Sequence, residues 1–271
     1  MESKAPPNPV ALYEQYFVPA MFRPWAIELL GLAALQSGER VLDVACGTGI
    51  VARQAAAQVG AAGRVVAIDI NPAMLAFARS LPAAAGAPID WRLGDATALP
   101  LDDRLFDVAL CQHGLQFFPD RVAALREMRR VLVPGGRCLV VVLQSISLHP
   151  VFEALMTAVA QELSVPVTTV ATPFALAEPE RLRGLFTDAG FGTVEVISTS
   201  ITARFPQPER FVPLAVVSSA AAIPAFLALA EPQRATFLES VGQRMQELLA
   251  RNRSGDVIQF PMFAWVVRAR Q

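Results

Sequence analysis

The chain has 271 residues, of which 54% are hydrophobic and 17% charged, and its formal net charge is −1. This composition is typical of a globular protein with a large apolar core, and it excludes a disordered chain. A charge so close to zero gives no field of one sign that would attract DNA, RNA or an anionic membrane, so we expect no nucleic-acid partner.

The cysteines and two sequence segments bear on the compartment. Cys46, Cys111 and Cys138 are odd in number and lack a metal-like spacing, so we expect no metal and a reducing, cytoplasmic location. The first nine residues contain no apolar segment, so we expect no secretory signal. Residues 212–230 carry no charge, but their prolines and alanines favour buried or lid helices over stable membrane insertion, with membrane association as the alternative.

The first half of the chain alternates between strand and helix patterns. An apolar helical pattern covers residues 10–36 and is broken near Pro19 and Pro24. The predicted strands that follow are 41–45, 65–68, 89–93, 106–111 and 138–143. The predicted helices between them are 50–59, one that begins at Pro72 after the capping residue Asn71, and 120–132, with a turn at 134–136.

The second half changes its pattern after residue 145. We predict a helix marked by apolar residues from Phe152 to Leu163, a helix over 179–189 ended by Gly190, a strand near 194–198, mostly helix over 207–253, and a last strand over 262–268. Pro261 is expected to limit the start of that strand, because proline cannot donate to a ladder. The apolar stripe from Phe237 to Leu249 indicates core packing, with a dimer face as the alternative.

Strands that alternate with helices predict an α/β fold. We expect a Rossmann-like, doubly wound, mostly parallel sheet of seven strands with helical lid insertions. The whole chain, 1–271, is expected to form one domain, with a ligand-binding core of about 37–145, 178–200 and 257–269 and a cap of about 1–36, 146–177 and 201–256. Right-handed crossovers bring the carboxyl ends of the parallel strands to one edge, where ligands bind.

The strongest motif is VLDVACGTGIVA, residues 41–52, in which a strand leads through Gly47-Thr48-Gly49 into a helix. Glycines permit a tight turn and let a ligand approach the backbone closely. Asp69 ends the second strand, 20 residues after Gly49, where a carboxylate can accept both ribose hydroxyl protons. These residues predict an adenosine-containing ligand, and by themselves they fit a dinucleotide equally well.

Two further carboxylates favour one ligand over the other. Asp43 lies within the first strand, where it could orient the amides of the turn or hold the ammonium of a methionine moiety. A pyrophosphate would gain nothing from an anion at that place. In Gly94-Asp95-Ala96, which follows the third strand, the carboxylate can accept an adenine amino proton.

Several motifs keep a common order and spacing. VLDVACGTG, AIDINPAML, GDATALPLDDRLFDVALC and RVLVPGGR resemble the successive signature motifs of class I S-adenosylmethionine (SAM)-dependent methyltransferases. They are most similar to the small-molecule group that includes the ubiquinone and menaquinone biosynthesis methyltransferases. The resemblance covers about residues 36–145 and, more weakly, 178–200, and one departure is Ala45, where the family often has glycine.

The resemblance implies SAM as the cofactor and S-adenosyl-L-homocysteine as its product. The cofactor-binding residues that it implies are Asp43, Ala45, Gly47, Thr48 and Gly49 around the methionine portion, Asp69 at the ribose, Ile70 and Met74 beside the adenine, Gly94, Asp95 and Ala96 at the adenine edge, and Gln112 near the methionine end. In such relatives an N-terminal aromatic residue often closes over the cofactor. Tyr16 is our candidate, ahead of Tyr13 and Arg23, with core packing as its alternative role.

Histidines and aromatic residues are the candidates for the acceptor side. His113 follows the fourth strand and is our candidate catalytic residue, because histidine titrates near neutrality and could take a phenol proton. Its alternatives are substrate orientation and a plain loop hydrogen bond. The candidate substrate-lining residues are Phe117, Phe118, His149 and Phe152, of which His149 could instead start a helix.

We therefore expect a methyltransferase that acts by in-line displacement on a small, largely apolar acceptor of aromatic, quinone-like or lipid-like character. The residues after the fourth strand, Gln112 to Leu115, lack the NPPY-type loop of many nucleic-acid methyltransferases. The alternatives are a SAM-binding protein of the same fold that does not methylate and an NAD(P)-dependent oxidoreductase. We expect a monomer or a homodimer.

Overall fold

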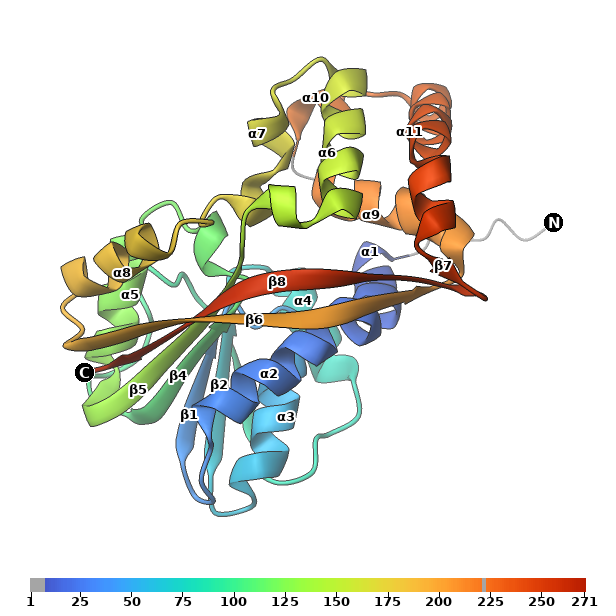
Figure 1. The fold of residues 1–271 in the computed structure, drawn as a ribbon. Helices are drawn as coiled ribbons and strands as arrows, with labels where there is room; N and C mark the ends of the chain where they lie inside the picture. The colour runs from blue at the N-terminus through green and yellow to red at the C-terminus, as the bar shows by residue number, and fades with distance from the viewer. Residues whose placement is uncertain (1–7, 221–222) are drawn as a thin grey trace.

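The computed structural model describes residues 8–220 and 223–271, which contain one sheet with the strand order β3-β2-β1-β4-β5-β8-β6 and β7 attached to β8 (Figure 1). The strands are β1 Arg40–Val44, β2 Arg64–Asp69, β3 Ile89–Leu93, β4 Phe106–Gln112, β5 Leu132–Leu143, β6 Thr193–Pro206, β7 Arg253–Ser254 and β8 Val257–Arg270. Strands β1 to β5 pair in parallel, whereas β8 runs antiparallel to both β5 and β6. The predicted α/β fold with a mostly parallel sheet is confirmed.

Helices cover both faces of this sheet. The helices α2 Arg23–Ala33 and α3 Ile50–Val59 pack on one face, and α5 Arg121–Arg130 and α8 Pro179–Asp188 pack on the other. Each face has its own hydrophobic cluster, with Trp25 in the first and Phe186 in the second. Because β5 is covered on both sides, its apolar run from Cys138 to Leu143 is buried throughout.

Capping residues fix where two helices beside the sheet begin. Asn71 Oδ1 accepts a hydrogen bond from the backbone N–H of Ala73 at 2.9 Å, so α4, Pro72–Ser80, starts at the predicted proline. Asp120 Oδ1 accepts from the N–H of Ala123 at 2.8 Å and caps α5 in the same way. Both helices therefore start at the carboxyl edge of the sheet, where ligands bind in this architecture.

The N-terminal segment is continuous through its prolines, so the predicted breaks are wrong. Three helical elements follow one another: α1 Pro9–Leu12, the π-helical η1 Tyr13–Phe22, and α2. Pro19 lies inside η1, where the wider π turn accommodates a residue that lacks an N–H donor. Pro24 lies in the first turn of α2, directly after the π-helical segment ends.

The cap stands on the carboxyl edge of the parallel strands (Figure 1). Its elements are α6 Pro150–Leu163, α7 Val167–Val170, η4 Thr172–Phe174, α9 Phe211–Ala220, α10 Pro224–Leu227 and α11 Glu231–Arg251. Helix α11 packs against α6 and α9, and its Phe237, Val241 and Met245 are buried, so the apolar stripe is core packing rather than a dimer face. None of the described helices combines the length and apolar character needed to cross a membrane. Residues 1–7 of the N-terminal segment and residues 221–222 of the charge-free segment 212–230 lie outside the described residues.

Several boundaries differ from the predictions. Strands β6 and β8 have 14 residues each, and Pro261 lies inside β8, opposite Thr202. The pairing of β5 with β8 ends at Ala264, so at Pro261 the strand has a partner on one side only and a missing N–H is tolerated. The predicted turn at 134–136 is a bulge within β5, and β7 is a two-residue eighth strand in addition to the seven predicted.

Candidate functional site

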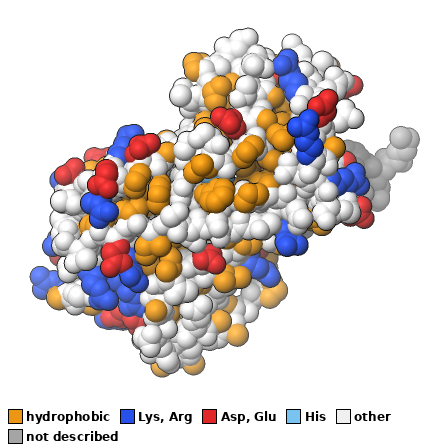
Figure 2. Space-filling model, viewed as in Figure 1, with side chains coloured by type: hydrophobic (Ala, Val, Ile, Leu, Met, Phe, Trp, Pro, Cys, Tyr) orange, Lys and Arg blue, Asp and Glu red, His pale blue; other side chains and the backbone are white. Residues whose placement is uncertain are grey.

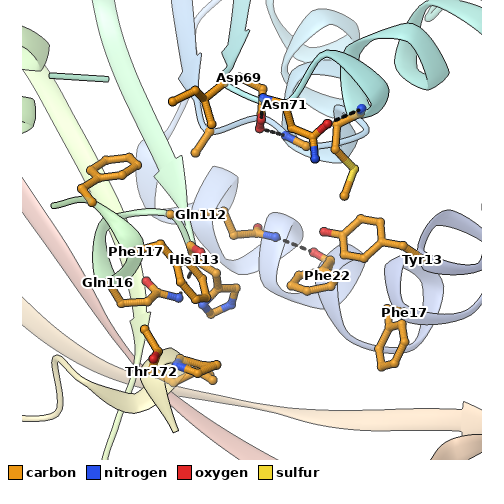
Figure 3. A pocket seen from close by; sticks show the side chains of 18 of the residues that line it. Tyr13, Phe17, Phe22, Asp69, Asn71, Gln112, His113, Gln116, Phe117 and Thr172 are labelled. Carbon is orange, nitrogen blue, oxygen red and sulfur yellow. Dashed lines mark hydrogen bonds between the residues drawn. The ribbon is translucent and has the colours of Figure 1, made fainter. Parts of the chain in front are cut away.

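A cavity of about 740 Å³ lies between the carboxyl edge of the parallel strands and the cap. Its walls come from the β1–α3 turn, the ends of β2 and β4, the helix η1, the turn η2 Leu115–Phe117, and the cap elements α6, α7 and η4. Figure 3 shows Asp69 at one end, Tyr13 and Phe17 along one side, and His113 and Gln116 on the other. The cavity thus has a polar end at β2 and polar side chains near the tip of β4.

The turn between β1 and α3 is built from left-handed backbone. Ala45, Gly47 and Gly49 have φ angles of +57°, +56° and +85°. Glycine adopts such angles freely, whereas an alanine there costs about 1 kcal/mol. Ala45 and Gly47 border the cavity, whereas Thr48 and Gly49 lie behind its surface, with the Trp91 indole of β3 against Gly49.

Asp69 connects this turn to the end of β2. Its Oδ2 accepts a hydrogen bond from the N–H of Gly47 at 2.7 Å, and its Oδ1 accepts from the N–H of Asn71 at 2.8 Å. Each carboxylate oxygen keeps lone pairs for further bonds, so the side chain can also accept protons from a ligand diol. Asp69 borders the cavity, together with Asn71.

Apolar and small residues continue the cavity beyond the end of β2. Ile70 is 70% exposed, and with Met74 and residues 94–96 it borders the cavity. Asp95 Oδ1 accepts hydrogen bonds from the N–H and the O–H of Thr97, both at 2.8 Å, and these bonds hold the pKa of Asp95 below its usual range. An exposed apolar surface beside an ionised carboxylate suits a flat ring that carries an amino group.

Asp43 supports the turn from behind and does not border the cavity. Its side chain is 1% exposed, and its Oδ2 accepts a hydrogen bond from the N–H of Ala52 at 3.0 Å. Burial raises the pKa of Asp43 to about 8, against the opposing effect of the Ala52 N–H. The observed contact is to an amide in the first turn of α3 and not to an amide of the β1–α3 turn, and the role of Asp43 toward a cofactor stays a prediction.

Tyr13, and not Tyr16, is the N-terminal tyrosine at the cavity. Tyr16 is 4% exposed and packs edge-on against Phe17, with ring centroids 5.4 Å apart, so the structure contradicts its predicted cofactor role and supports core packing. Tyr13 borders the cavity, and its Oη lies 3.8 Å from the point where a Cβ atom on Gly47 would be. The spacing of four residues from Tyr13 through Phe17 to Met21 could have indicated this wall.

Gln112 and His113 form the tip of β4. Gln112 Nε2 donates a hydrogen bond to the Phe22 carbonyl at 3.1 Å. The His113 backbone has a φ of +52°, and its ring packs edge-on against Phe22 and Trp25 at centroid distances of 6.0 and 5.7 Å. Burial lowers the pKa of His113 to about 3, so its ring is neutral at pH 7.

His149 lies behind the wall of the cavity, so the structure contradicts its predicted substrate-lining role. Its Nε2 accepts a hydrogen bond from the N–H of Phe263 at 2.9 Å, and therefore its Nδ1 carries the proton and donates to the Ser145 carbonyl, also at 2.9 Å. The ring contacts Phe174, which itself borders the cavity. Nε2 ties the start of α6 to β8, and Nδ1 ties it to Ser145 just before it in the chain, which agrees with the helix-start role left open above.

The part of the cavity away from β2 is mostly apolar. Phe117, Phe118 and Phe152 border it, Phe117 is 56% exposed, and their role in lining a substrate stays a prediction. Among the described lining residues, the charged side chains are Asp69 and Asp95, and both are at the polar end. An uncharged ligand therefore suits the remainder.

Sequence reasoning missed other polar residues at the cavity. Asn71 was noted only as a helix cap, yet it borders the cavity beside the end of β2. Gln116 and Thr172 border it from η2 and η4, two single turns for which the sequence carries no periodic signal. No pattern in the chain brings these two turns together, because they meet only through the fold.

Comparisons with known proteins agree with this site. Residues 41–136 match a family model described as a methyltransferase domain. The chain is 33% identical over 185 residues to the ubiquinone/menaquinone biosynthesis C-methyltransferase UbiE of Chromobacterium violaceum, and the match covers 65% of this chain and 76% of that protein. The chain belongs to the class I SAM-dependent methyltransferases.

A second curated relative and a solved structure are also similar to this chain. It is 40% identical over 119 residues to the 2-phytyl-1,4-naphtoquinone methyltransferase of Synechococcus elongatus, a match that covers 43% of this chain and 51% of that protein. The chain thus spans about half the length of the first curated relatives that it matches. The phosphoethanolamine N-methyltransferase 2 of Haemonchus contortus, solved with SAM, shares the fold, with a TM-score of 0.55, 19% identity, and coverage of 96% of this chain and 56% of that one.

The residues at the polar end fit SAM, the cofactor of this family. The described lining residues include the carboxylates of Asp69 and Asp95 and no lysine or arginine. This charge suits a ligand with a sulfonium and an ammonium, and it does not suit a pyrophosphate. Gln112 Oε1 is buried without a partner in the described part of the chain, and it could accept a bond from the ammonium. Asp69 would hold the ribose diol, and Ile70 and Met74 would flank the adenine.

Proposed function

We propose that this protein transfers a methyl group from SAM to a small, uncharged, largely apolar acceptor of aromatic or quinone-like character. The observation that supports this best is the cavity itself, which runs from the Asp69 carboxylate past the tip of β4 to a wall of phenylalanines. The names of the quinone methyltransferases among the relatives point to the same acceptor class.

In this proposal the protein mainly aligns the two reactants. SAM supplies a methyl group already activated by its positively charged sulfur. The β1–α3 turn and Asp69 hold the cofactor, and the aromatic residues of η1 and the cap exclude water from the space beside it. Gln112 and His113 lie between the two halves of the cavity, where the methyl group would pass.

His113 is proposed to orient the acceptor rather than to remove its proton. With a pKa of about 3, the imidazole is a weak base at pH 7, far from the matched pKa that efficient proton abstraction needs. A neutral ring still offers one donor and one acceptor nitrogen. The earlier prediction of His113 as a general base is therefore replaced by its alternative, substrate orientation.

The test has two steps. In a thermal-shift titration, SAM and S-adenosyl-L-homocysteine should each raise the Tm of the protein. Asp69→Asn should reduce this rise, whereas Asp188→Asn, at an exposed residue, should leave it unchanged. An assay of S-adenosyl-L-homocysteine release over phenolic and quinol acceptors should then show turnover. Binding of SAM without release for any acceptor would contradict methyl transfer and favour a SAM-binding protein with another role.

A further inference from the structure

Two glutamines near the tip of β4 have amide groups whose orientation is fixed. Gln116 Nε2 donates to the His113 carbonyl at 3.0 Å, and Gln112 Nε2 donates to the Phe22 carbonyl at 3.1 Å. A backbone carbonyl can only accept, so in both side chains the NH₂ group is used and the oxygen is the free atom. Both Oε1 atoms are buried without a partner in the described part of the chain.

Gln112 and Gln116 differ in where they lie. Gln112 ends β4 near the expected methionine end of the cofactor, whereas Gln116 is in η2 next to Phe117, on the apolar side of the cavity. Gln116 is only 2% exposed, and Figure 3 shows it beside His113 and Thr172. A buried amide oxygen without a partner is costly in a folded protein, so its position at a cavity points to a ligand that donates to it.

His113 adds a second atom of the same kind. Both of its ring nitrogens are buried, and neither has a hydrogen-bond partner among the described residues. The other histidine is a natural comparison, because both ring nitrogens of His149 are bonded to backbone groups. A neutral imidazole has one N–H donor and one acceptor nitrogen, so Gln116 and His113 together offer an acceptor and a donor to the same part of the cavity.

We propose that Gln116 Oε1 accepts a hydrogen bond from a neutral donor on the acceptor molecule, such as a phenolic hydroxyl, whose oxygen accepts from the N–H of the neutral His113 ring, and that the two residues so select acceptors that carry such a donor. This inference rests on the proposed methyl transfer in this cavity. An ether or a carbonyl at the same place would bring its oxygen against the Gln116 oxygen without a proton between them. A charged donor is excluded because no acidic side chain borders the described cavity on this side.

The two atoms are buried, so binding must include a small movement of the side chains that cover them, while Gln116 Nε2 keeps its bond to the His113 carbonyl. Phe117, the next residue in η2, is 56% exposed, so it can move aside at little cost in buried surface. A bond from the ligand then replaces packing around an acceptor that had no partner.

The first test compares 1-naphthol with 1-methoxynaphthalene as probes, in protein saturated with S-adenosyl-L-homocysteine. Gln116→Met should weaken 1-naphthol binding about tenfold and leave the ether and the cofactor product unaffected. Gln144→Met is the matched control, because Gln144 is also buried but bonds to Ser198 and the Ala264 carbonyl away from the cavity. Equal losses for both probes in Gln116→Met would overturn the proposal.

The second test uses the unaltered protein, so it does not depend on how a variant folds. The chain has two histidines, and nitrogen-15 spectra of their rings should show that 1-naphthol shifts one His113 nitrogen and leaves His149 in place, whereas the ether shifts neither. A His113 signal that does not respond to 1-naphthol would contradict the inference. Failure of methyl transfer with intact 1-naphthol binding would instead contradict the proposed function.

Discussion

Gly38 and Gly49 have nearly the same φ angle but different neighbouring atoms. Their φ values are +86° and +85°, yet a Cβ atom on Gly38 would meet nothing within 4 Å, whereas one on Gly49 would overlap the Trp91 indole. Gly38→Ala should therefore cost only the backbone strain, about 1 kcal/mol. Gly49→Ala should cost about 3 kcal/mol and weaken SAM binding, because overpacking displaces the β1–α3 turn. Urea unfolding and SAM titration check both, and equal stabilities would contradict the assigned contact.

Asp43 should make stability depend on pH in an unusual direction. Because burial raises its pKa to about 8, the native state holds a proton that the unfolded chain loses near pH 4. Between these values the unfolded state binds fewer protons at this carboxyl, so Asp43 lowers stability as pH rises from about 4 to 8. Below about pH 6.5 His113 opposes this effect, because its buried ring stays neutral where the unfolded histidine is charged, so the net fall is expected between about pH 6.5 and 8. Asp43→Asn, which imitates the protonated acid, should remove that slope in urea unfolding between pH 7 and 8.

Asp107 provides the control for this pH experiment. Its pKa is lowered by its hydrogen bonds to Arg40, so it is ionised in both states throughout the range from pH 5 to 8. Asp107→Asn should therefore shift the free energy of unfolding by a constant amount and leave the slope as it is. A slope that survives in Asp43→Asn would mean that another group carries the proton.

At the scale of single residues, the sequence best predicts the position of a residue that lies in, or directly beside, a turn with a recognisable motif. Gly47 and Asp69 follow from a strand, a turn and the next strand, all close in the chain. Tyr16 and His149 could not be placed, because their burial depends on Phe205 and Phe263, which are more than 100 residues away. Gln116 carries no pattern, since its role depends on a cavity that only the fold creates.

At the scale of elements, an ion pair joins the N-terminal helix to the cofactor turn. Glu14 of η1 bonds Arg53 of α3 at 2.7 Å, with side chains only 15% and 17% exposed, and Arg53 also donates to the Thr48 carbonyl. Glu14→Gln should cost about 2 kcal/mol of stability and weaken SAM binding several-fold, because η1 carries Tyr13 at the cavity. Denaturant unfolding and SAM titration measure the two effects.

The matching control removes a carboxylate from a more exposed ion pair. Glu195 bonds Arg268 between β6 and β8, and Glu195→Gln should change stability by about 0.5 kcal/mol or less and leave SAM binding unchanged. If Glu14→Gln behaves like Glu195→Gln, the pair does not position η1.

Element lengths were predicted well for β1 to β4 and poorly for β5 and the antiparallel edge. In β3 and α3 the apolar pattern and the flanking turns agree with the observed bounds, Ile89–Leu93 and Ile50–Val59. Strand β6 extends eight residues past its predicted end, because its distal half pairs with β8 and packs on η1. In that half, TSITARFP, the apolar residues Ile201, Ala203 and Phe205 alternate with exposed polar ones, since only one of its faces is buried.

At the scale of the whole molecule, the order of strands and helices was enough to predict the architecture, whereas the cap was not predictable in detail. Two separate segments of the chain build it, 150–174 and 211–251, and their helices are apolar enough to pack in more than one way. The hydrophobic cluster that contains Trp25 and Val141 beside the sheet also contains Met156 and Met245 of the cap. The expectation of one domain over the whole chain stays a prediction, and this shared cluster makes it testable.

If cap and sheet are one cooperative unit, loss of packing in the cap must destabilise the sheet. Met245 is 1% exposed, so Met245→Ala should cost about 3 kcal/mol, whereas Glu247→Ala on the exposed side of the same helix should cost little. Far-ultraviolet circular dichroism and tryptophan fluorescence, which reports on Trp25, Trp91 and Trp265 in or beside the sheet, should show one coincident transition in each variant. SAM at a hundred times its Kd should raise that whole transition by about 2.7 kcal/mol, although its expected contacts lie mainly at the sheet edge. A cap that melts first, leaving the fluorescence transition and SAM binding unchanged, would divide the chain into two units.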